Sequence, residues 1–229
     1  MRKCALVLMS GCLFICAGLT ACHYPKDPRD TTQTVMKRGL RAGISESPPW
    51  TNVEKRLLEK FARELGVQVH WVHGSESQLF ESLDHFLLDV VIAGITKNTP
   101  YKEKVGITIP YHKMRVVVGG RPEVFPPPKS LKKARIAVSY PDPVRAELER
   151  KGAEPVELEN PFMFNGLIAA PVFELEARGM KTSNVELANK EFVMAVPPGE
   201  NGWLMRLEEF LRAHKSEVHQ MLIEEVKPR

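Results

Sequence analysis

The spacing of apolar residues between positions 77 and 93 predicts a helix followed by a buried strand. Apolar side chains recur at three- and four-residue intervals, which is typical of a helix with one apolar face; these are Leu79, Phe80, Leu83, Phe86 and Leu87. Residues 90–93 then form a short, continuously apolar run. Such a run is typical of a strand that is covered on both faces.

The loop that follows this strand is a candidate binding edge. Gly94 ends the strand where a β-carbon would obstruct a turn or a close approach, and Ile95 and Thr96 come next. In open α/β sheets, ligands bind beyond the carboxyl ends of the strands. A strand followed by Gly-x-Thr is equally compatible with a plain connection, so this pattern needs support from the rest of the chain.

Elsewhere, apolar periodicity predicts strands and helices in alternation. We expect strands at 39–44, 67–72, 114–118, 134–138, 155–157, 167–170 and 192–196, and helices at 53–65, 142–151, 172–178, 203–212 and 216–226. This alternation is typical of α/β folds with parallel sheets. Gly119-Gly120 and three consecutive prolines from position 126 indicate a break between two halves.

Three short motifs carry a resemblance to a known family: Gly94-x-Thr96, Pro110-Tyr111, and Pro48-Pro49-Trp50 after the first strand. They resemble the bacterial extracytoplasmic solute-binding proteins of the amino-acid type, family 3. The segment from residue 77 to residue 95 is also similar to the binding-protein-like half of the F-type membrane-bound lytic transglycosylases. The catalytic domain of those enzymes has no counterpart in this sequence.

The resemblance implies an α/β architecture with two lobes, the type 2 periplasmic-binding-protein fold. Each lobe is then a mostly parallel sheet flanked by helices, and two crossing strands form the hinge. We expect the first lobe at 35–117 and 197–229 and the second at 118–196, with hinge points near Val118 and Val196.

The same resemblance implies where a ligand would bind. The aromatic residue after the two prolines packs against the ligand in this family, and that role maps onto Trp50; the alternative is a tryptophan that only fills the edge of the lobe. The expected ligand-binding residues are Trp50, Gly94, Ile95, Thr96 and Tyr101 in the first lobe and Ser139 and Asp142 in the second. Ser139 and Asp142 stand at the start of an expected helix, whose free N–H groups attract anions.

Two departures from the family pattern bear on the ligand. Tyr101 stands where amino-acid binders carry an arginine that clamps the α-carboxylate, and Ala169 and Ala170 stand where an acid would bind the ammonium group. Loss of a charge-assisted hydrogen bond to a buried ligand costs about 2–5 kcal/mol. We therefore expect a less charged, larger or peptide-like solute rather than a free α-amino acid.

The N-terminus has the pattern of a lipoprotein signal. Arg2 and Lys3 precede a short apolar run, and residues 19–22 (Leu-Thr-Ala-Cys) resemble the lipobox of bacterial lipoproteins. We expect a signal peptide at 1–21, lipidation of Cys22, and a polar tether at 22–34. His23 follows the cysteine, which in the enteric sorting scheme implies the outer membrane; an ordinary secretory signal or an uncleaved anchor is the alternative.

Composition narrows the remaining function classes. The four cysteines all lie within the first 22 residues, and the formal net charge is only +4, so neither a disulfide framework, a cysteine nucleophile nor a nucleic-acid partner is expected. His70 and His73 would point to opposite faces of a strand, so we expect no metal. The sequence contains no recognisable cofactor or catalytic motif, and we expect a monomer that is not an enzyme.

The sequence thus favours a lipid-anchored protein on the periplasmic side that captures a small solute for an ABC-type importer. Two alternatives remain open at this point. The same fold could act as an envelope sensing or interaction module near peptidoglycan, with a protein partner, or it could carry an enzyme activity.

Overall fold

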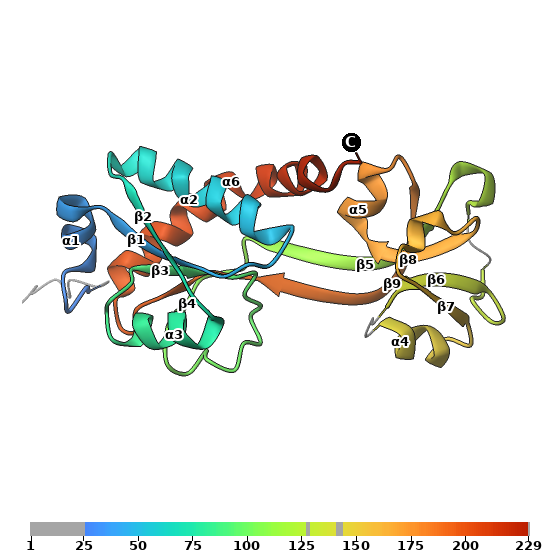
Figure 1. The fold of residues 1–229 in the computed structure, drawn as a ribbon, viewed down its shortest axis with the longest axis horizontal. Helices are drawn as coiled ribbons and strands as arrows, with labels where there is room; N and C mark the ends of the chain where they lie inside the picture. Colours follow the sequence, from blue (N-terminus) through green and yellow to red (C-terminus); the bar gives the residue numbers. More distant parts are fainter. Residues whose placement is uncertain (1–25, 127–128, 141–143, 229) are drawn as a thin grey trace, which may run out of the picture.

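A computed structural model describes residues 26–126, 129–140 and 144–228, which form two lobes joined by two long strands (Figure 1). The elements α1, α2, α3 and α6 surround one sheet, and we call this part the first lobe. The elements α4 and α5 surround the other sheet, and we call this part the second lobe. Within the described ranges, no helix is long and apolar enough to cross a membrane.

The first lobe contains a mixed five-stranded sheet in the order β2-β1-β3-β10-β4. Its strands are β1 (Leu40–Ile44), β2 (Val69–His73), β3 (Val90–Ile92), β4 (Gly106–Ile107) and β10 (Ala195–Val196). Strands β2, β1 and β3 run parallel, and β10 is antiparallel to both of its neighbours. The parallel half therefore directs the carboxyl ends of β1 and β3 towards the same edge.

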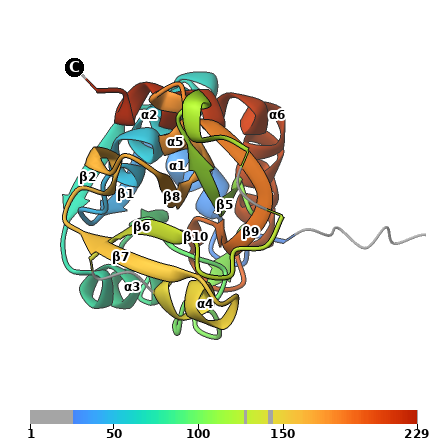
Figure 2. The same cartoon turned by 90° about the vertical axis from the view of Figure 1, so that its right-hand side faces the viewer.

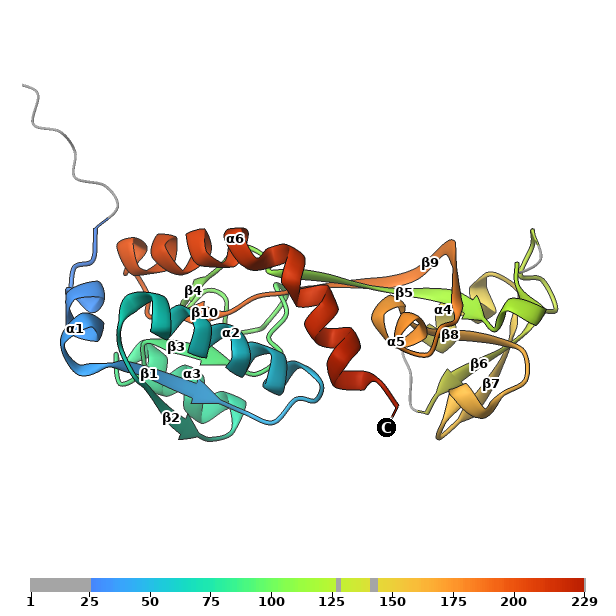
Figure 3. The same ribbon diagram turned by 90° about the horizontal axis from the view of Figure 1, so that it is seen from above.

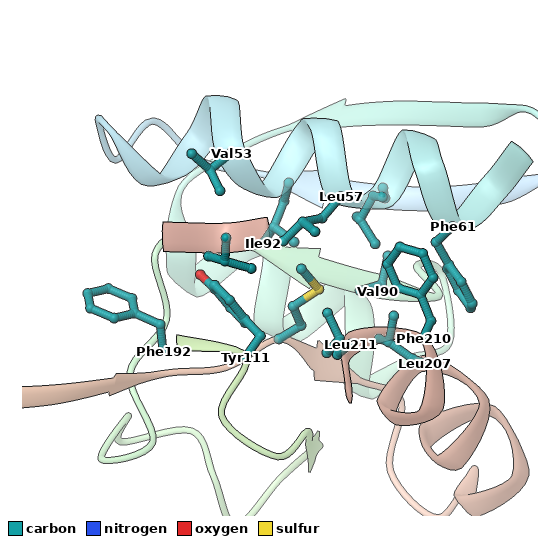
Figure 4. Close-up of a cluster of buried hydrophobic side chains, with 14 of the residues drawn as sticks. Val53, Leu57, Phe61, Val90, Ile92, Tyr111, Phe192, Leu207, Phe210 and Leu211 are labelled. Atoms are coloured by element: carbon teal, nitrogen blue, oxygen red, sulfur yellow. The ribbon is translucent and has the colours of Figure 1, made fainter. Parts of the chain in front are cut away.

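Helices cover both faces of this sheet. The helices of the first lobe are α1 (Thr31–Arg38), α2 (Trp50–Leu65), α3 (Glu76–Asp84) and α6 (Asn201–Val226). Alternate residues of β3 face opposite sides: Val90 and Ile92 pack with α2 and α6, whereas Val91 packs with α3. Figure 4 shows the α2–α6 side, where buried side chains of both helices meet the sheet.

The second lobe contains a five-stranded sheet in the order β7-β6-β8-β5-β9. Its elements are β5 (His112–Gly120), β6 (Arg135–Ser139), α4 (Val144–Arg150), β7 (Glu154–Leu158), β8 (Leu167–Pro171), α5 (Val172–Ala177) and β9 (Lys181–Phe192), with 3₁₀ turns η1 (Pro122–Val124) and η2 (Pro161–Met163). Strands β7, β6 and β8 are parallel, and β5 pairs antiparallel with β8 and β9. Figure 2 views the molecule from the end of this lobe.

Strands β5 and β9 cross between the lobes and pair with one another along most of their length. In Figures 1 and 3 they form the bridge between the two lobes. The two-lobed α/β fold expected from the sequence is therefore confirmed.

The second crossing strand lies elsewhere than expected. It is β9, at Lys181–Phe192, and not a strand at 192–196. Ala195 pairs with Val91 and Ile107 of the first sheet, so the range 118–196 expected for the second lobe includes a strand of the first. The polar sequence of β9 explains the error, because nearly all of its side chains remain at least partly exposed.

Two helices also differ from the expectation. The two helices expected at 203–212 and 216–226 form one helix, α6. Of the polar residues between them, Lys215 is exposed and His214 pairs with Glu64 of α2 (3.0 Å), so neither interrupts the helix. The helix expected to continue through Leu87 ends at Asp84, and Phe86 has a positive φ of 60°. The Leu87 side chain is consequently exposed rather than part of the apolar face.

The segment expected to be a tether at 22–34 is partly folded. Residues 31–38 form α1, and the residues just before it bind the start of α6. Asp27 Oδ1 accepts a hydrogen bond from Trp203 N (2.8 Å), and Glu200 accepts hydrogen bonds from Arg29 N (3.0 Å) and Thr31 N (3.1 Å). The chain from residue 26 onward is thus fixed to the first lobe, while Cys22 lies outside the described residues.

Candidate ligand-binding site

The carboxyl ends of β1 and β3 point towards the second lobe (Figure 3). Two loops begin there, one after Ile44 and one after Ile92. Because ligands of open α/β sheets bind at this edge, these loops form the first-lobe side of the candidate site. The sequence-based choice of the Gly94–Thr96 loop therefore corresponds to a real sheet edge in the structure.

Gly94 is required by the local geometry of this loop. Its φ of +62° lies in the left-handed region, and a β-carbon at Gly94 would lie 2.5 Å from Ser47 Oγ. Ser47 belongs to the loop after β1 and was not expected as a site residue. The close approach brings the two loops together, which the sequence could not reveal because they are far apart in the chain.

A buried carboxyl group from α2 also fixes the Gly94–Thr96 loop by a hydrogen bond. Glu54 is fully buried in α2, and its Oε2 accepts a hydrogen bond from Gly94 N (3.0 Å). Its Oε1 accepts a second from the Tyr111 hydroxyl (2.8 Å), whose ring lies within the apolar cluster of Figure 4. The Gly94 N–H is consequently occupied by the protein and is not free for a ligand.

Burial favours the neutral forms of both Glu54 and Tyr111. Desolvation raises the pKa of Glu54 from 4.5 to about 7, although the hydrogen bonds from Gly94 and Tyr111 oppose the shift. Desolvation, together with the nearby Glu54 charge, also raises the pKa of Tyr111 well above its ordinary value. The phenol therefore stays protonated and donates to Glu54 throughout the physiological range.

The loop is also joined to the hinge. The Ile95 carbonyl accepts a hydrogen bond from Val193 N (2.9 Å), and Thr96 forms a β-bridge with Phe192 at the end of β9. The Ile95 side chain is buried in the cluster around α3, so only its backbone lies at the edge. The Thr96 hydroxyl makes no hydrogen bond with any described residue, which leaves it available to a ligand.

Trp50 is covered by the protein's own aromatic side chains. Its ring stacks on Phe192 with centroids 3.5 Å apart, and Phe173 of α5 meets it edge-on at 5.9 Å. His112 lies 5.6 Å from it, and only 6% of Trp50 is exposed. Packing of a ligand on this indole stays a prediction, and it requires Phe173 or Phe192 to move.

Tyr101 lies apart from Trp50. Its ring stacks on Phe80 of α3 at 4.3 Å, in a different hydrophobic cluster from the one that contains Trp50. The half-buried phenol also lines a cavity of about 330 Å³ beside α3. The structure therefore does not bring Tyr101 into the group formed by Trp50, Gly94 and Ser47.

On the second lobe, the expected edge is only partly described. Ser139 is the exposed last residue of β6, and its hydroxyl makes no hydrogen bond with a described residue. Asp142 lies outside the described residues. Ala169 and Ala170 are buried in β8, where they pair with Val118 and Val117. Neither position provides an acidic side chain for a ligand.

The lobes also touch through α5 and α6. His219 Nε2 of α6 lies 2.6 Å from Glu176 Oε2 of α5, and the His219 ring stacks on His112 at 5.9 Å. Burial, together with the charges of His219 and Lys215, lowers the pKa of His112 from 6.5 to about 4, so this imidazole is neutral at pH 7. Among the described residues, no group of three or more His, Cys, Asp or Glu side chains could hold a metal ion.

The two lobes, the paired crossing strands and the loops at the strand ends define the class of two-lobed binding proteins. The chain belongs to the bacterial extracellular solute-binding proteins, family 3, which it matches over residues 51–223. It is therefore a solute-binding protein of the amino-acid type, and this family implies an extracytoplasmic location. No curated protein matches the chain significantly.

Solved structures agree with this fold. An ancestral cationic amino acid solute-binding protein (AncCDT-1) is similar with a TM-score of 0.66 and 20% identity, covering 86% of this chain and 100% of its own. A structure of an ancestral cyclohexadienyl dehydratase, AncCDT-3, has a TM-score of 0.63 and 19% identity, covering 84% and 95%. The GluR0 ligand-binding core in complex with L-glutamate has a TM-score of 0.52 and 14% identity, covering 82% and 98%.

At these identities the neighbours show the fold alone. One is a binding protein by name and another an enzyme, so the fold does not by itself separate binding from catalysis. The resemblance to lytic transglycosylases stays a prediction.

Sequence reasoning missed three residues that shape the site: Ser47, Glu54 and Phe192. Glu54 lies among apolar residues on the buried face of α2, beside Val53 and three positions before Leu57. An acid on the apolar face of a predicted helix is a usable signal, because buried carboxyl groups need hydrogen-bond partners. Phe192 offered no comparable signal, because β9 itself was not recognised.

Proposed function

We propose that this protein is a lipid-anchored solute-binding protein that captures an amino-acid-related or peptide-like solute between its lobes for an ABC-type importer. The observation that carries the proposal is the construction of the Gly94–Thr96 loop. Glu54 fixes the loop from the first lobe, and Val193 and Phe192 join it to the hinge. A ligand that binds Thr96 is thereby connected directly to the strand about which the lobes would move.

The solute is expected to lack the charged pair of a free α-amino acid. Tyr101, which replaces the family's arginine, is uncharged and packs against α3. The nearby Lys97 is already paired with Glu191 (3.2 Å). Planar carboxylates are bound best by an arginine fork, and none is present at the expected position. Hydroxyl donors such as Thr96 and Ser139 suit amide or hydroxyl groups, which favours peptide-like solutes.

The proposed anchor rests on the signal pattern at the N-terminus, and the proposed partner rests on the family. Acylation of Cys22 would hold the first lobe at the membrane, because the chain is fixed to that lobe from residue 26 onward. We propose that the protein acts as a monomer that delivers the solute to a permease, on the periplasmic side and in the outer membrane if the cell has one.

A thermal-shift screen tests the proposal. The mature chain with Cys22→Ser is heated with amino acids, oligopeptides, sugars, polyamines and muropeptides. A ligand at a hundredfold excess over its Kd stabilises the folded state by about 2.7 kcal/mol, which raises Tm by several degrees. We expect a shift with peptide-like solutes that is reduced in Thr96→Val and retained in the control Thr182→Val. Thr182 is also half-buried, but it lies on the part of β9 that pairs with the end of β5, away from the candidate site.

The covered Trp50 supports a second candidate function. Because its indole is stacked on Phe192 and closed off by Phe173, the chain itself fills the place where the family packs a ligand. The fold would then serve as an envelope interaction module without transport. This candidate would be favoured if no solute of the panel shifted Tm and if crosslinking to the intact lipoprotein recovered a cell-wall protein.

A further inference from the structure

A small cationic cavity lies at the outer end of the first lobe, away from the candidate ligand site. It has a volume of about 160 Å³, which is roughly the share of five water molecules in the liquid. Figure 3 shows α1, which lines it, at the end of the first lobe opposite the second lobe. The polar residues that line the cavity are Arg29, Thr31, Thr34, Arg38, Arg41 and Asp89.

Three arginines and one carboxylate, Asp89, line this cavity, and a second carboxylate, Glu200, bonds to the backbone of two lining residues. Asp89 is 2% exposed and binds both Arg38 (Nη2–Oδ1 2.8 Å) and Arg41 (Nη2–Oδ1 3.0 Å). Glu200 is buried and accepts hydrogen bonds from the backbone N–H groups of Arg29 and Thr31. An excess of one positive charge remains, and Arg38 and Arg41 are each about 30% exposed, so part of that charge is accessible.

Several donors around the cavity are unused within the described part of the chain. The Arg29 guanidinium stacks on the Phe86 ring, with Cζ 4.2 Å from the centroid, and donates no hydrogen bond to a described residue. Arg41 uses Nε and Nη2 but not Nη1, and Arg38 uses Nη1 and Nη2 but not Nε. The hydroxyl of Thr34 is also unbonded there. Arg29 is exposed, and no fully buried side-chain polar atom of the less exposed described residues lacks a partner, so these donors are accessible to solvent.

From this arrangement we propose that the cavity binds a phosphate group. Guanidinium groups suit oxyanions because they are planar, permanently charged and rich in donors. Here the donors come from three separate arginines and a hydroxyl, which matches a tetrahedral phosphate better than a planar carboxylate. The site is distinct from the loop of the solute site and uses none of its residues.

The phosphate could belong to a soluble ligand or to a lipid headgroup. The lipid source rests on the proposed anchor at Cys22. Arg29 is seven steps along the chain from Cys22, and an extended chain spans at most about 3.5 Å per step, so the cavity would lie within about 25 Å of the acylated end. A headgroup bound there would orient the first lobe on the membrane.

In the first experiment, the mature chain carrying Cys22→Ser is titrated with inorganic phosphate. Binding is measured by calorimetry and by NMR of the backbone amides. Saturable binding is expected, with shifts centred on the amides of Thr34, Arg38 and Arg41. Arg29→Gln should weaken binding about tenfold, since it removes a charge-assisted contact. The control Lys37→Gln removes the same charge from an exposed position on α1 and should change binding by less than about twofold.

A second arm distinguishes the sources. The same protein is mixed with phosphatidylcholine vesicles with and without phosphatidylglycerol. Recruitment that depends on phosphatidylglycerol, is competed by phosphate and is lost in Arg29→Gln assigns the site to a lipid headgroup. Phosphate binding without recruitment assigns it to a soluble phosphate-bearing ligand.

Four results would overturn the proposal: no saturable phosphate binding, equal affinity for acetate, equal loss in Lys37→Gln, or NMR shifts centred elsewhere. Because the NMR shifts are measured on the chain with all three arginines intact, the test does not depend on the stability of a cavity variant. The outcome is also independent of the solute screen, which reports on Thr96 and the opposite edge of the lobe.

Discussion

Glu54 shows how a single buried residue positions a binding loop. Its carboxyl group has no access to solvent, and its two oxygens accept hydrogen bonds from Gly94 N and Tyr111 Oη. The pKa of about 7 means that the group changes charge near neutral pH. The loop is therefore held by a group whose ionisation is unfavourable in the folded state.

Glu54 should make stability fall as pH rises. In the unfolded chain it titrates near 4.5, whereas in the fold it retains its proton up to about 7. Stability from the protonated group is thus fully present below 4.5 and is lost as pH rises through 7, by up to about 3 kcal/mol. Glu54→Gln mimics the protonated acid, so the free energy of unfolding of the wild type should drop relative to this variant between pH 4.5 and 8, as measured by urea denaturation.

The matched control for this prediction is Glu59→Gln, an exposed position on the same helix. It should show no such pH-dependent difference. His112 also titrates with a lowered pKa, but it is present in all three proteins and cancels in the comparison. A difference between wild type and Glu54→Gln that stays constant across this range would contradict the account.

At the scale of residues, the sequence predicted that position 94 requires a glycine, but it did not predict which residues contact Gly94. A glycine that ends a buried strand is visible in the chain itself, and its positive φ agrees with that prediction. Ser47 and Glu54 are 47 and 40 residues away from Gly94, and only the fold brings them together. Tyr101 was assigned to the site only by its position relative to the family motifs, and in the structure its ring packs beside α3, on Phe80.

Among the elements, α5 joins the second lobe to the first. Phe173 is 2% exposed and packs against Trp50 in the large cluster of the first lobe. Phe173→Ala should therefore lower the free energy of unfolding by about 3 kcal/mol and increase hydrogen exchange in α5 and in the C-terminal half of α6. Phe164→Ala, in the cluster of the second lobe alone, should leave exchange in α6 unchanged.

A failure of Phe173→Ala to alter exchange in α6 would show that α5 does not hold the lobes together. The same variant also uncovers Trp50. If the solute site uses this indole, solute affinity should rise or stay constant in Phe173→Ala rather than fall.

The starts of α1 and α6 stabilise each other through Asp27. Its Oδ1 accepts from Trp203 N, and its Oδ2 accepts from the backbone and hydroxyl of Thr32. Asp27→Asn should cost about 1 kcal/mol in urea denaturation, because the amide cannot accept at both sites. Asp30→Asn is the matched control, since the Asp30 side chain makes no capping hydrogen bond; an equal loss in both variants would argue against this role.

At the scale of elements, strands and helices with a strong apolar period were predictable, and polar ones were not. Strand β3 and helix α2 agree with their predicted ranges within a few residues. Strand β9 is rich in Lys, Asn and Glu because it crosses between the lobes with most side chains exposed, so no alternation marked it. Residues 26–34 likewise gave no apolar period, because hydrogen bonds to Asp27 and Glu200 hold them on the first lobe.

For the whole molecule, the two-lobed architecture was predictable from short motifs, whereas the contact between the lobes was not. The motifs lie within single strand–loop units, which the chain encodes locally. The contact among Trp50, Phe173 and Phe192 joins residues from α2, α5 and β9, and none of them was linked to the others by spacing. The crossing strands β5 and β9 then make hinge motion the expected response to a ligand.

Hydrogen exchange of the mature chain, with and without the solute that gives the largest thermal shift, tests the central claim most directly. If the solute binds between the lobes, the Gly94–Thr96 loop and the end of β6 at Ser139 should both gain protection, and the end of β9 at Phe192 should follow. Protection confined to one lobe or to the cavity beside α1, or no stabilising solute at all, would contradict the claim that this protein captures a solute between its lobes.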